Sequence, residues 1–112
     1  MSKFHIRFYM CVCLLIGAVP AAAQTALGTI TGTITDPSGA PVPNVDVVAK
    51  ATATGLTYRG GTTDSGVYVI PNLPIGQFEI TASAPGFKQV QRTGLNLEVA
   101  QRLRVDLSLE VG

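Results

Sequence analysis

Apolar and polar residues alternate along most of the chain from residue 28 onward, and turn-forming residues interrupt the alternation at intervals of about ten residues. A period of two places successive side chains on opposite faces of a β-strand, so that one face is buried and the other is wet. The segment GTITGTIT (28–35) shows this most simply, because Ile30 and Ile34 point to one side and the threonines to the other. The pattern predicts about seven strands in a single all-β, Greek-key-type β-sandwich.

The strongest pattern lies near the end of the chain, in RLRVDLSLEV (102–111). Apolar residues occupy every second position there, at Leu103, Val105, Leu107, Leu109 and Val111. A shift of one residue would bury the polar set, so the register is fixed and one continuous strand is predicted. Val105→Asp is therefore expected to unfold the domain, whereas Asp106→Ala on the wet face should change its stability by about 0.5 kcal/mol at most.

Shorter patterns of the same kind predict the other strands. They begin near Asn44, cover 57–63, surround Tyr68 and Ile70, cover 77–84, and include the alternating stretch of Leu95, Leu97 and Val99. Gly60 and Gly61 remove two side chains from one strand, which suggests a bulge or an edge position. Pro71 and Pro74 lack backbone donors and are expected to end the strand around Tyr68, with Leu73 between them closing the core.

The first residues have the pattern of an export signal. Lys3 and Arg7 supply positive charge, residues 8–19 form an apolar run, and Pro20 precedes three alanines at 21–23. The run is shorter than the roughly 20 apolar residues that a helix needs to span a bilayer. We therefore predict cleavage after Ala23 and no membrane span in the mature chain.

The predicted organisation is a signal peptide over 1–23, a short lead over 24–27 and a β-sandwich domain over 28–112. Both cysteines and the single histidine belong to the signal, so 89 of the 112 residues remain without a disulfide. Lys3 and Arg7 leave as well, so the eight Lys and Arg fall to six, against seven Asp and Glu. This balance does not favour nucleic acid or an anionic membrane surface as a partner.

The same composition argues against catalysis. Without His or Cys, the mature domain lacks the commonest general base, metal ligand and thiol nucleophile. Its serines have only Lys50 and Lys88 as bases, in no recognisable serine-lysine motif, and we interpret them as turn or surface hydroxyls. Lys50 faces outward and Lys88 lies near a turn, which also argues against an isopeptide crosslink. We expect no enzyme activity and no cofactor.

Two kinds of ligand site have candidate residues. Asp36 and Asp64 lie in the turns DPSG and TDSG and are candidates for calcium, although a single carboxylate in a turn is explained by its capping of the following amides. We therefore predict no metal site and favour the capping interpretation. Tyr58 and Tyr68 are the aromatic candidates for stacking against a sugar, since the chain has no Trp, although Tyr68 is also expected to belong to the rim of the core.

Three ordered segments resemble a known family: GTITGTITDPSGAPVPNVDVVA, then TTDSGVYVIPNLPIGQFEITASAPGFK, then LRVDLSLEV. They are similar to the carboxypeptidase regulatory-like domain, a transthyretin-like β-sandwich. In particular they resemble the version that precedes the plug and barrel of TonB-dependent outer-membrane receptors. The resemblance covers Gly28 to Val111. It implies a non-catalytic periplasmic domain, and the zinc ligands of the associated peptidases are absent.

We accordingly expect an exported interaction or accessory module, located in the periplasm or on the periplasmic side of the outer membrane. The resemblance implies the N-terminal domain of a TonB-dependent receptor, as a fragment or a free-standing relative. Its expected partner is a protein of the cell envelope such as a receptor plug and barrel. The alternatives are a carbohydrate-binding module, with carbohydrate as the ligand, and an adhesin-type structural domain.

Overall fold

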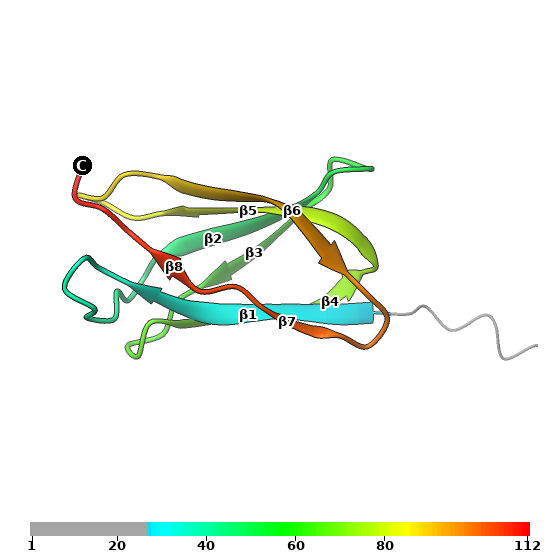
Figure 1. The fold of residues 1–112 in the computed structure, drawn as a ribbon, viewed down its shortest axis with the longest axis horizontal. Helices are drawn as coiled ribbons and strands as arrows, with labels where there is room; N and C mark the ends of the chain where they lie inside the picture. Colours follow the sequence, from blue (N-terminus) through cyan, green and yellow to red (C-terminus); the bar gives the residue numbers. More distant parts are fainter. Residues whose placement is uncertain (1–26) are drawn as a thin grey trace, which may run out of the picture.

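The computed structural model describes residues 27–112, which form two four-stranded β-sheets packed face to face (Figure 1). The eight strands are β1 (Leu27–Thr35), β2 (Asp46–Ala51), β3 (Thr57–Gly61), β4 (Val67–Pro74), β5 (Gly76–Ser83), β6 (Val90–Leu97), β7 (Arg102–Arg104) and β8 (Leu107–Ser108). The predicted all-β sandwich is confirmed. It has eight strands because the strand expected over 102–111 is divided into β7 and β8.

The predicted signal peptide and its cleavage after Ala23 lie outside the described residues and stay predictions. β1 begins at Leu27, the last residue of the predicted lead. No helix in the described part of the chain has the length and apolar character needed to cross a membrane.

The first sheet has the order β4-β1-β7, and β8 also pairs with β1. The second sheet has the order β3-β2-β5-β6. β7 and β8 run parallel to β1, whereas the other paired strands are antiparallel. The chain crosses between the sheets four times, after β1, β3, β4 and β6, in keeping with the expected Greek-key type.

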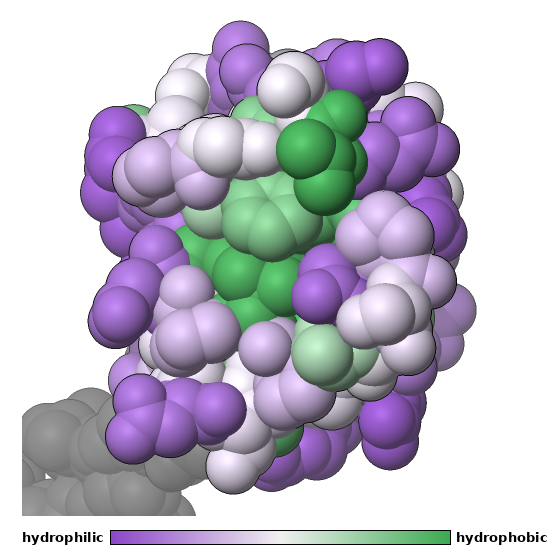
Figure 2. Space-filling model, turned by 90° about the vertical axis from the view of Figure 1, so that its left-hand side faces the viewer, coloured by the Kyte–Doolittle hydropathy of each residue, from purple (hydrophilic) through white to green (hydrophobic). Residues whose placement is uncertain are grey.

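The core lies between the two sheets and is made of the residues predicted to face inward. Among those that are fully buried are Ile30, Ile34, Val47, Ala49, Ile80 and Leu109. Figure 2 shows one end of the sandwich, where apolar side chains fill the middle and polar ones form the rim. Burial of one face of each main strand fixes its register, since a slip by one residue would exchange the two faces.

The edge position expected from Gly60 and Gly61 is confirmed, because β3 is an outer strand of the second sheet. The expectation that prolines end the strand around Tyr68 is wrong, since β4 continues through Pro71 to Pro74. β4 is itself an edge strand, where a residue without an N–H is tolerated. Its pairing with β1 is irregular near Asn72, which has a φ of 59°. Leu73 is fully buried, as expected.

Two apolar residues do not lie where alternation placed them. Val99 is 61% exposed, because β6 ends at Leu97 and the chain turns through Ala100 with a φ of 54°. Val111 is 69% exposed, because it lies beyond β8 and forms an isolated antiparallel bridge with Phe87. In both cases a turn or a strand end interrupts the period of two, so the parity of the preceding residues no longer applies.

Candidate functional site

The outer face of the first sheet carries an open groove of about 480 Å³. It is lined by Thr31, Gly32, Thr33, Val67, Arg102 and Arg104. These residues come from β1, β4 and β7, the three strands that lie side by side in this sheet. We call this feature the threonine-arginine groove.

Strand register explains how these side chains meet. Thr31 of β1 lies beside Arg104 of the parallel strand β7 and beside Val69 of the antiparallel strand β4. Thr33 lies beside Val67 in the same way. Because neighbours in register project to the same face, the threonines form the floor, with valines on one side and arginines on the other.

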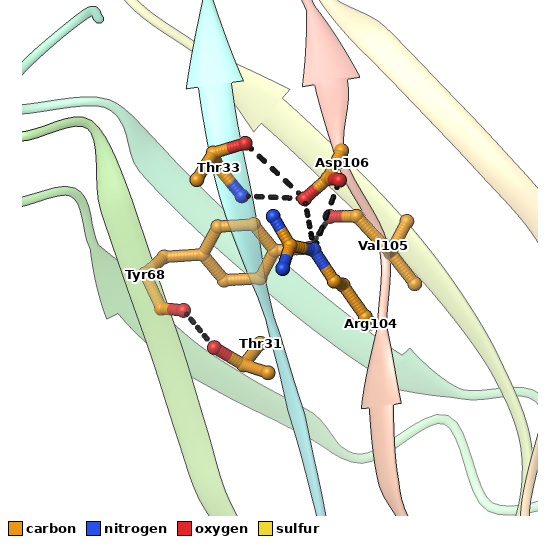
Figure 3. Close-up of polar contacts among 6 residues, drawn as sticks. All are labelled: Thr31, Thr33, Tyr68, Arg104, Val105 and Asp106. Atoms are coloured by element: carbon orange, nitrogen blue, oxygen red, sulfur yellow. Dashed lines mark hydrogen bonds and ion pairs between the residues drawn. The ribbon is translucent and has the colours of Figure 1, made fainter.

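A carboxylate holds the sheet together at one end of the groove (Figure 3). The backbone N–H of Thr33 donates to Oδ1 of Asp106 at 2.9 Å, and the Thr33 hydroxyl lies 3.2 Å from the same oxygen. Arg104 Nε donates to Oδ2 of Asp106 at 3.0 Å. The side chain of Asp106 thus takes the place of a backbone acceptor, and this substitution explains why the ladder is interrupted between β7 and β8.

The carbonyl of Val105, the residue before Asp106, is turned toward the core. The fully buried Tyr68 donates its hydroxyl to the Val105 carbonyl oxygen at 2.5 Å. Space for that carbonyl exists because residue 32 is glycine, where any Cβ would overlap the Val105 oxygen. The inward glycine of GTITGTIT therefore accommodates the irregular junction between β7 and β8.

The electrostatic environment follows from these contacts. The backbone hydrogen bond from Thr33 is the main cause that lowers the pKa of Asp106 below its ordinary value, and Arg104 adds to it. Burial raises the pKa of Tyr68 to about 12, and the negative charge of Asp106 contributes in the same direction. At neutral pH the junction therefore holds an ionised Asp106 and a neutral Tyr68.

Tyr68 is wrong as a sugar-stacking candidate, because its ring is fully buried in the core. Tyr58 is half-buried on β3, and its ring meets the edge of Phe78 with a centroid separation of 6.3 Å and an interplanar angle of 61°. The two tyrosines lie on strands of different sheets. They do not form a shared stacking platform.

Asp36 caps its own turn, as expected. Its Oδ1 accepts the backbone N–H of Ser38 at 2.9 Å, the Ser38 hydroxyl at 2.6 Å and the backbone N–H of Ala40 at 3.0 Å. The Ser38 hydroxyl contributes most to lowering the pKa of Asp36, followed by the Ala40 N–H. These local contacts account for the Asp in the DPSG turn.

The turns that carry Asp36 and Asp64 lie at the same end of the sandwich, since one follows β1 and the other precedes its antiparallel neighbour β4. Within residues 27–112, no group of three or more His, Cys, Asp or Glu gathers as a metal site. Calcium binding by Asp36 and Asp64 stays a prediction.

Thr62 was not identified from the sequence as a residue with a specific role. It is 7% exposed, and its hydroxyl donates to the Val42 carbonyl at 2.7 Å and accepts the Val45 N–H at 2.9 Å. These bonds fasten the corner before β2. The partners lie 17 and 20 residues away along the chain, so no local pattern could have indicated the contact.

The groove offers hydrogen-bond donors and no assembled nucleophile. Its two guanidinium groups suit an anionic ligand. The threonine hydroxyls already donate within the protein, Thr31 to the Tyr68 carbonyl at 2.9 Å and Thr33 to Asp106 at 3.2 Å, so toward a ligand they offer only acceptor lone pairs. Within the described residues, Arg104 uses only Nε in a side-chain hydrogen bond, and Arg102 makes none. Binding is the chemistry that this arrangement supports.

Comparison with known proteins agrees with the fold. Residues 29–110 match the family model of the carboxypeptidase regulatory-like domain. No curated protein sequence matches the chain.

Several solved structures share the fold at low sequence identity. A hydroxyquinol 1,2-dioxygenase from Pseudomonas putida DLL-E4 is 11% identical with a TM-score of 0.64, over 82% of this chain and 59% of that one. The minor pilin GBS52 of Streptococcus agalactiae is 12% identical with a TM-score of 0.63, over 79% and 46%. A putative carbohydrate binding protein from Bacteroides uniformis is 15% identical with a TM-score of 0.59, over 73% and 40%. The chain spans less than two thirds of each, and this likeness concerns the fold alone.

Proposed function

Because the chain belongs to the carboxypeptidase regulatory-like domain family, we propose that it is an exported, non-catalytic β-sandwich module with an accessory or interaction role in the cell envelope. Its place would be the periplasm or the periplasmic side of the outer membrane. In its most specific form the proposal is the N-terminal domain of a TonB-dependent receptor, as part of one or as a free-standing relative. The partner would be a receptor plug and barrel.

The use of the polar side chains is the observation that carries this proposal. Asp36, Thr62, Tyr68 and Asp106 all bind backbone groups and so hold turns, a corner and an irregular strand junction in place. Such residues fix a surface and do not assemble a reaction centre. A rigid module with an open, donor-rich groove supports a role in contact with a partner.

Export and partner contact can be tested together in a Gram-negative host. Residues 1–112 with a C-terminal affinity tag should be recovered from the periplasmic or outer-membrane fraction, shortened by the 23 residues of the signal. A photo-crosslinking residue in place of Thr29 should give an adduct with a plug-and-barrel receptor, whereas one in place of Val48 on the second sheet should not. Retention of the uncleaved chain in the cytoplasm would contradict the proposal, as would hydrolase activity of the purified domain.

A carbohydrate-binding role is the second candidate. Tyr58 supports it, because its ring is half-buried at an edge strand and retains an accessible part. Calorimetric titration of the mature domain with oligosaccharides, compared with Tyr58→Ala, tests the idea. Heat that disappears in the variant would favour sugar binding over a protein partner. An adhesin-type structural role is the third candidate, because the chain shares its fold with the minor pilin. This role predicts neither sugar binding nor the receptor adduct.

A further inference from the structure

We propose that the threonine-arginine groove binds an extended acidic peptide segment in which carboxylate and apolar side chains alternate. The inference rests on the proposed role as an interaction module and specifies the chemistry of its partner. It follows from the arrangement of side chains on three neighbouring strands and from the distribution of charge over the two sheets.

The groove has three parallel rows of side chains with the same spacing. Val67 lines one side, and Val69, 43% exposed on the same face of β4, continues it. Arg102 and Arg104 form the other side, with the threonines of β1 between the two rows. Side chains two residues apart on one face of a strand repeat at about 6.6 to 6.8 Å, so each row has this period.

An extended peptide has the matching geometry. Its successive side chains point to opposite sides and repeat at the same interval of about 6.6 to 6.8 Å. A peptide lying along the β1 direction would turn one set of side chains toward the arginines and the other toward the valines. Its backbone would lie over the threonine floor. The hydroxyls of Thr31 and Thr33 donate their own hydrogens to the Tyr68 carbonyl and to Asp106, so their oxygens can accept peptide N–H groups. Carboxylates on one side of the peptide would contact the arginines, and aliphatic side chains on the other side would contact the valines.

The donors of this face already hold one carboxylate, that of Asp106. Oδ1 of Asp106 accepts the Thr33 N–H at 2.9 Å, and Arg104 Nε completes the pair. The side chains of Arg104 and Asp106 remain 68% and 49% exposed, so the guanidinium is oriented by the pair but not covered by it. Arginine presents a planar fork of five N–H groups, and the Nε contact leaves the terminal nitrogens available for a second carboxylate.

The outer face of the second sheet lacks this surplus of positive charge. Arg59 donates to Asp46 at 3.1 Å on that face, and Lys50 is in register with Glu79. These charges are matched, whereas on the first sheet Arg104 pairs with Asp106 and, within the described residues, Arg102 has no side-chain hydrogen bond or ion pair. The contrast favours an anionic partner at the threonine-arginine groove over one on the outer face of the second sheet.

Two peptides of equal composition test the geometry. The probe is the acetylated and amidated peptide SEVEVEVS, and its control is the isomer SEEEVVVS, which carries the same charge without alternation. Calorimetry on the mature domain at low salt should show binding of the probe, with the isomer weaker by about tenfold because it cannot satisfy both walls at once. Equal binding of the two peptides would overturn the proposed register and leave only charge attraction.

Two variants that each remove one positive charge test where the peptide binds. Arg102→Gln should weaken probe binding by about tenfold, because a charge-assisted hydrogen bond is lost. Arg59→Gln on the second sheet should leave the affinity within about twofold, since rim charges away from the site act mainly through screened long-range attraction. Circular dichroism confirms that both variants are folded. Equal weakening by both variants would overturn the assignment of the groove.

The remaining outcomes also decide the matter. If neither peptide binds at millimolar concentration, the proposal fails and the arginines serve to protect the β7 edge from unwanted strand pairing. If an oligogalacturonate binds more tightly than the probe, the groove is an acidic-sugar site and not a peptide site. Export and the receptor adduct are measured independently, so loss of peptide binding with both intact rejects the groove inference alone.

Discussion

Asp36 and Asp106 each accept several hydrogen bonds through one carboxylate, but they reach their partners over very different distances along the chain. Asp36 binds groups two and four residues ahead, within its own turn. Asp106 binds Thr33, which lies 73 residues earlier. The turn at 36–40 therefore organises itself, whereas the junction at 104–106 exists only when β1 and β7 are paired.

The difference has an energetic consequence. A local cap forms in part in the unfolded chain, so its loss is felt in both states. A contact across 73 residues is absent from the unfolded chain, so its loss weakens the folded state alone. We therefore revise the expectation that Asp106→Ala is nearly neutral, which treated the residue as a solvated position on a wet face.

Replacing one glycine in each of the two regions should give the largest difference in the free energy of unfolding. Gly32→Ala places a Cβ against the Val105 carbonyl and should cost at least about 3 kcal/mol, because the acceptor of a buried hydroxyl is displaced in a packed core. Gly39→Ala in the Asp36 turn meets open space, and its φ of 86° makes it cost about 1 kcal/mol. Urea denaturation of both variants measures the difference. Equal costs would show that the junction is no more demanding than the turn.

Tyr68→Phe should cost about 1 to 2 kcal/mol at neutral pH, because the Val105 carbonyl loses its buried donor. The pKa of Tyr68 is raised to about 12 in the folded protein from 10. The resulting stabilisation is complete below pH 10 and is lost as the pH rises toward 12. Urea midpoints of wild type should therefore fall over this range, and those of Tyr68→Phe should fall less. Tyr58→Phe is the matched control, and an identical alkaline profile for all three proteins would contradict the role of Tyr68.

Asp106→Ala should lower the free energy of unfolding by about 1 kcal/mol, since the Thr33 N–H and the Arg104 guanidinium lose an exposed but shared acceptor. Asp36→Ala should lower Tm as well, by a smaller amount, because its partners lie in the same turn. Thermal melts at pH 7 compare the two. A larger effect for Asp36 would reverse the comparison.

The smallest expected effect is on the thermal stability of the domain at acidic pH. The pKa values of Asp36 and Asp106 are both lowered in the folded protein from 3.8, so the unfolded state takes up protons first. Their contribution is fully present above that value and is lost as the pH falls below it. The Tm of wild type should decline more steeply below pH 4 than that of an Asp36→Asn, Asp106→Asn double variant, by no more than a few degrees in a domain of this size. Parallel curves would show that neither carboxylate is linked to folding.

Much of the sandwich could be predicted because burial imposes a period of two on each strand. The faces of β1, β2 and β5 followed from that rule. The edge position of β3 followed instead from Gly60 and Gly61, and the burial of Leu73 from its place between two prolines. The rule failed where the chain leaves the ladder. Val99 and Val111 lie past strand ends. The separate expectation that prolines end a strand failed at Pro71, which lies on an edge strand where its missing N–H carries little cost.

The candidate site was less accessible to prediction. The outward direction of Arg102, Arg104 and Asp106 followed from alternation, yet nothing in the sequence indicated that β7 lies parallel to β1. The threonine-arginine groove depends on that pairing. Thr62 was missed because its partners lie 17 and 20 residues away along the chain. Tyr68 was offered as a ligand residue because it and Tyr58 are the tyrosines of the predicted mature chain, which has no Trp.

The sequence by itself determined the class of fold, the faces of the main strands and the capped turn at Asp36, since each of these depends on neighbours within a few residues. The tertiary structure alone decided the break between β7 and β8, the buried contact of Tyr68 with Val105 and the groove on the first sheet. Those features join residues 34 to 73 positions apart, and such contacts become favourable only after the strands have paid the entropy of coming together.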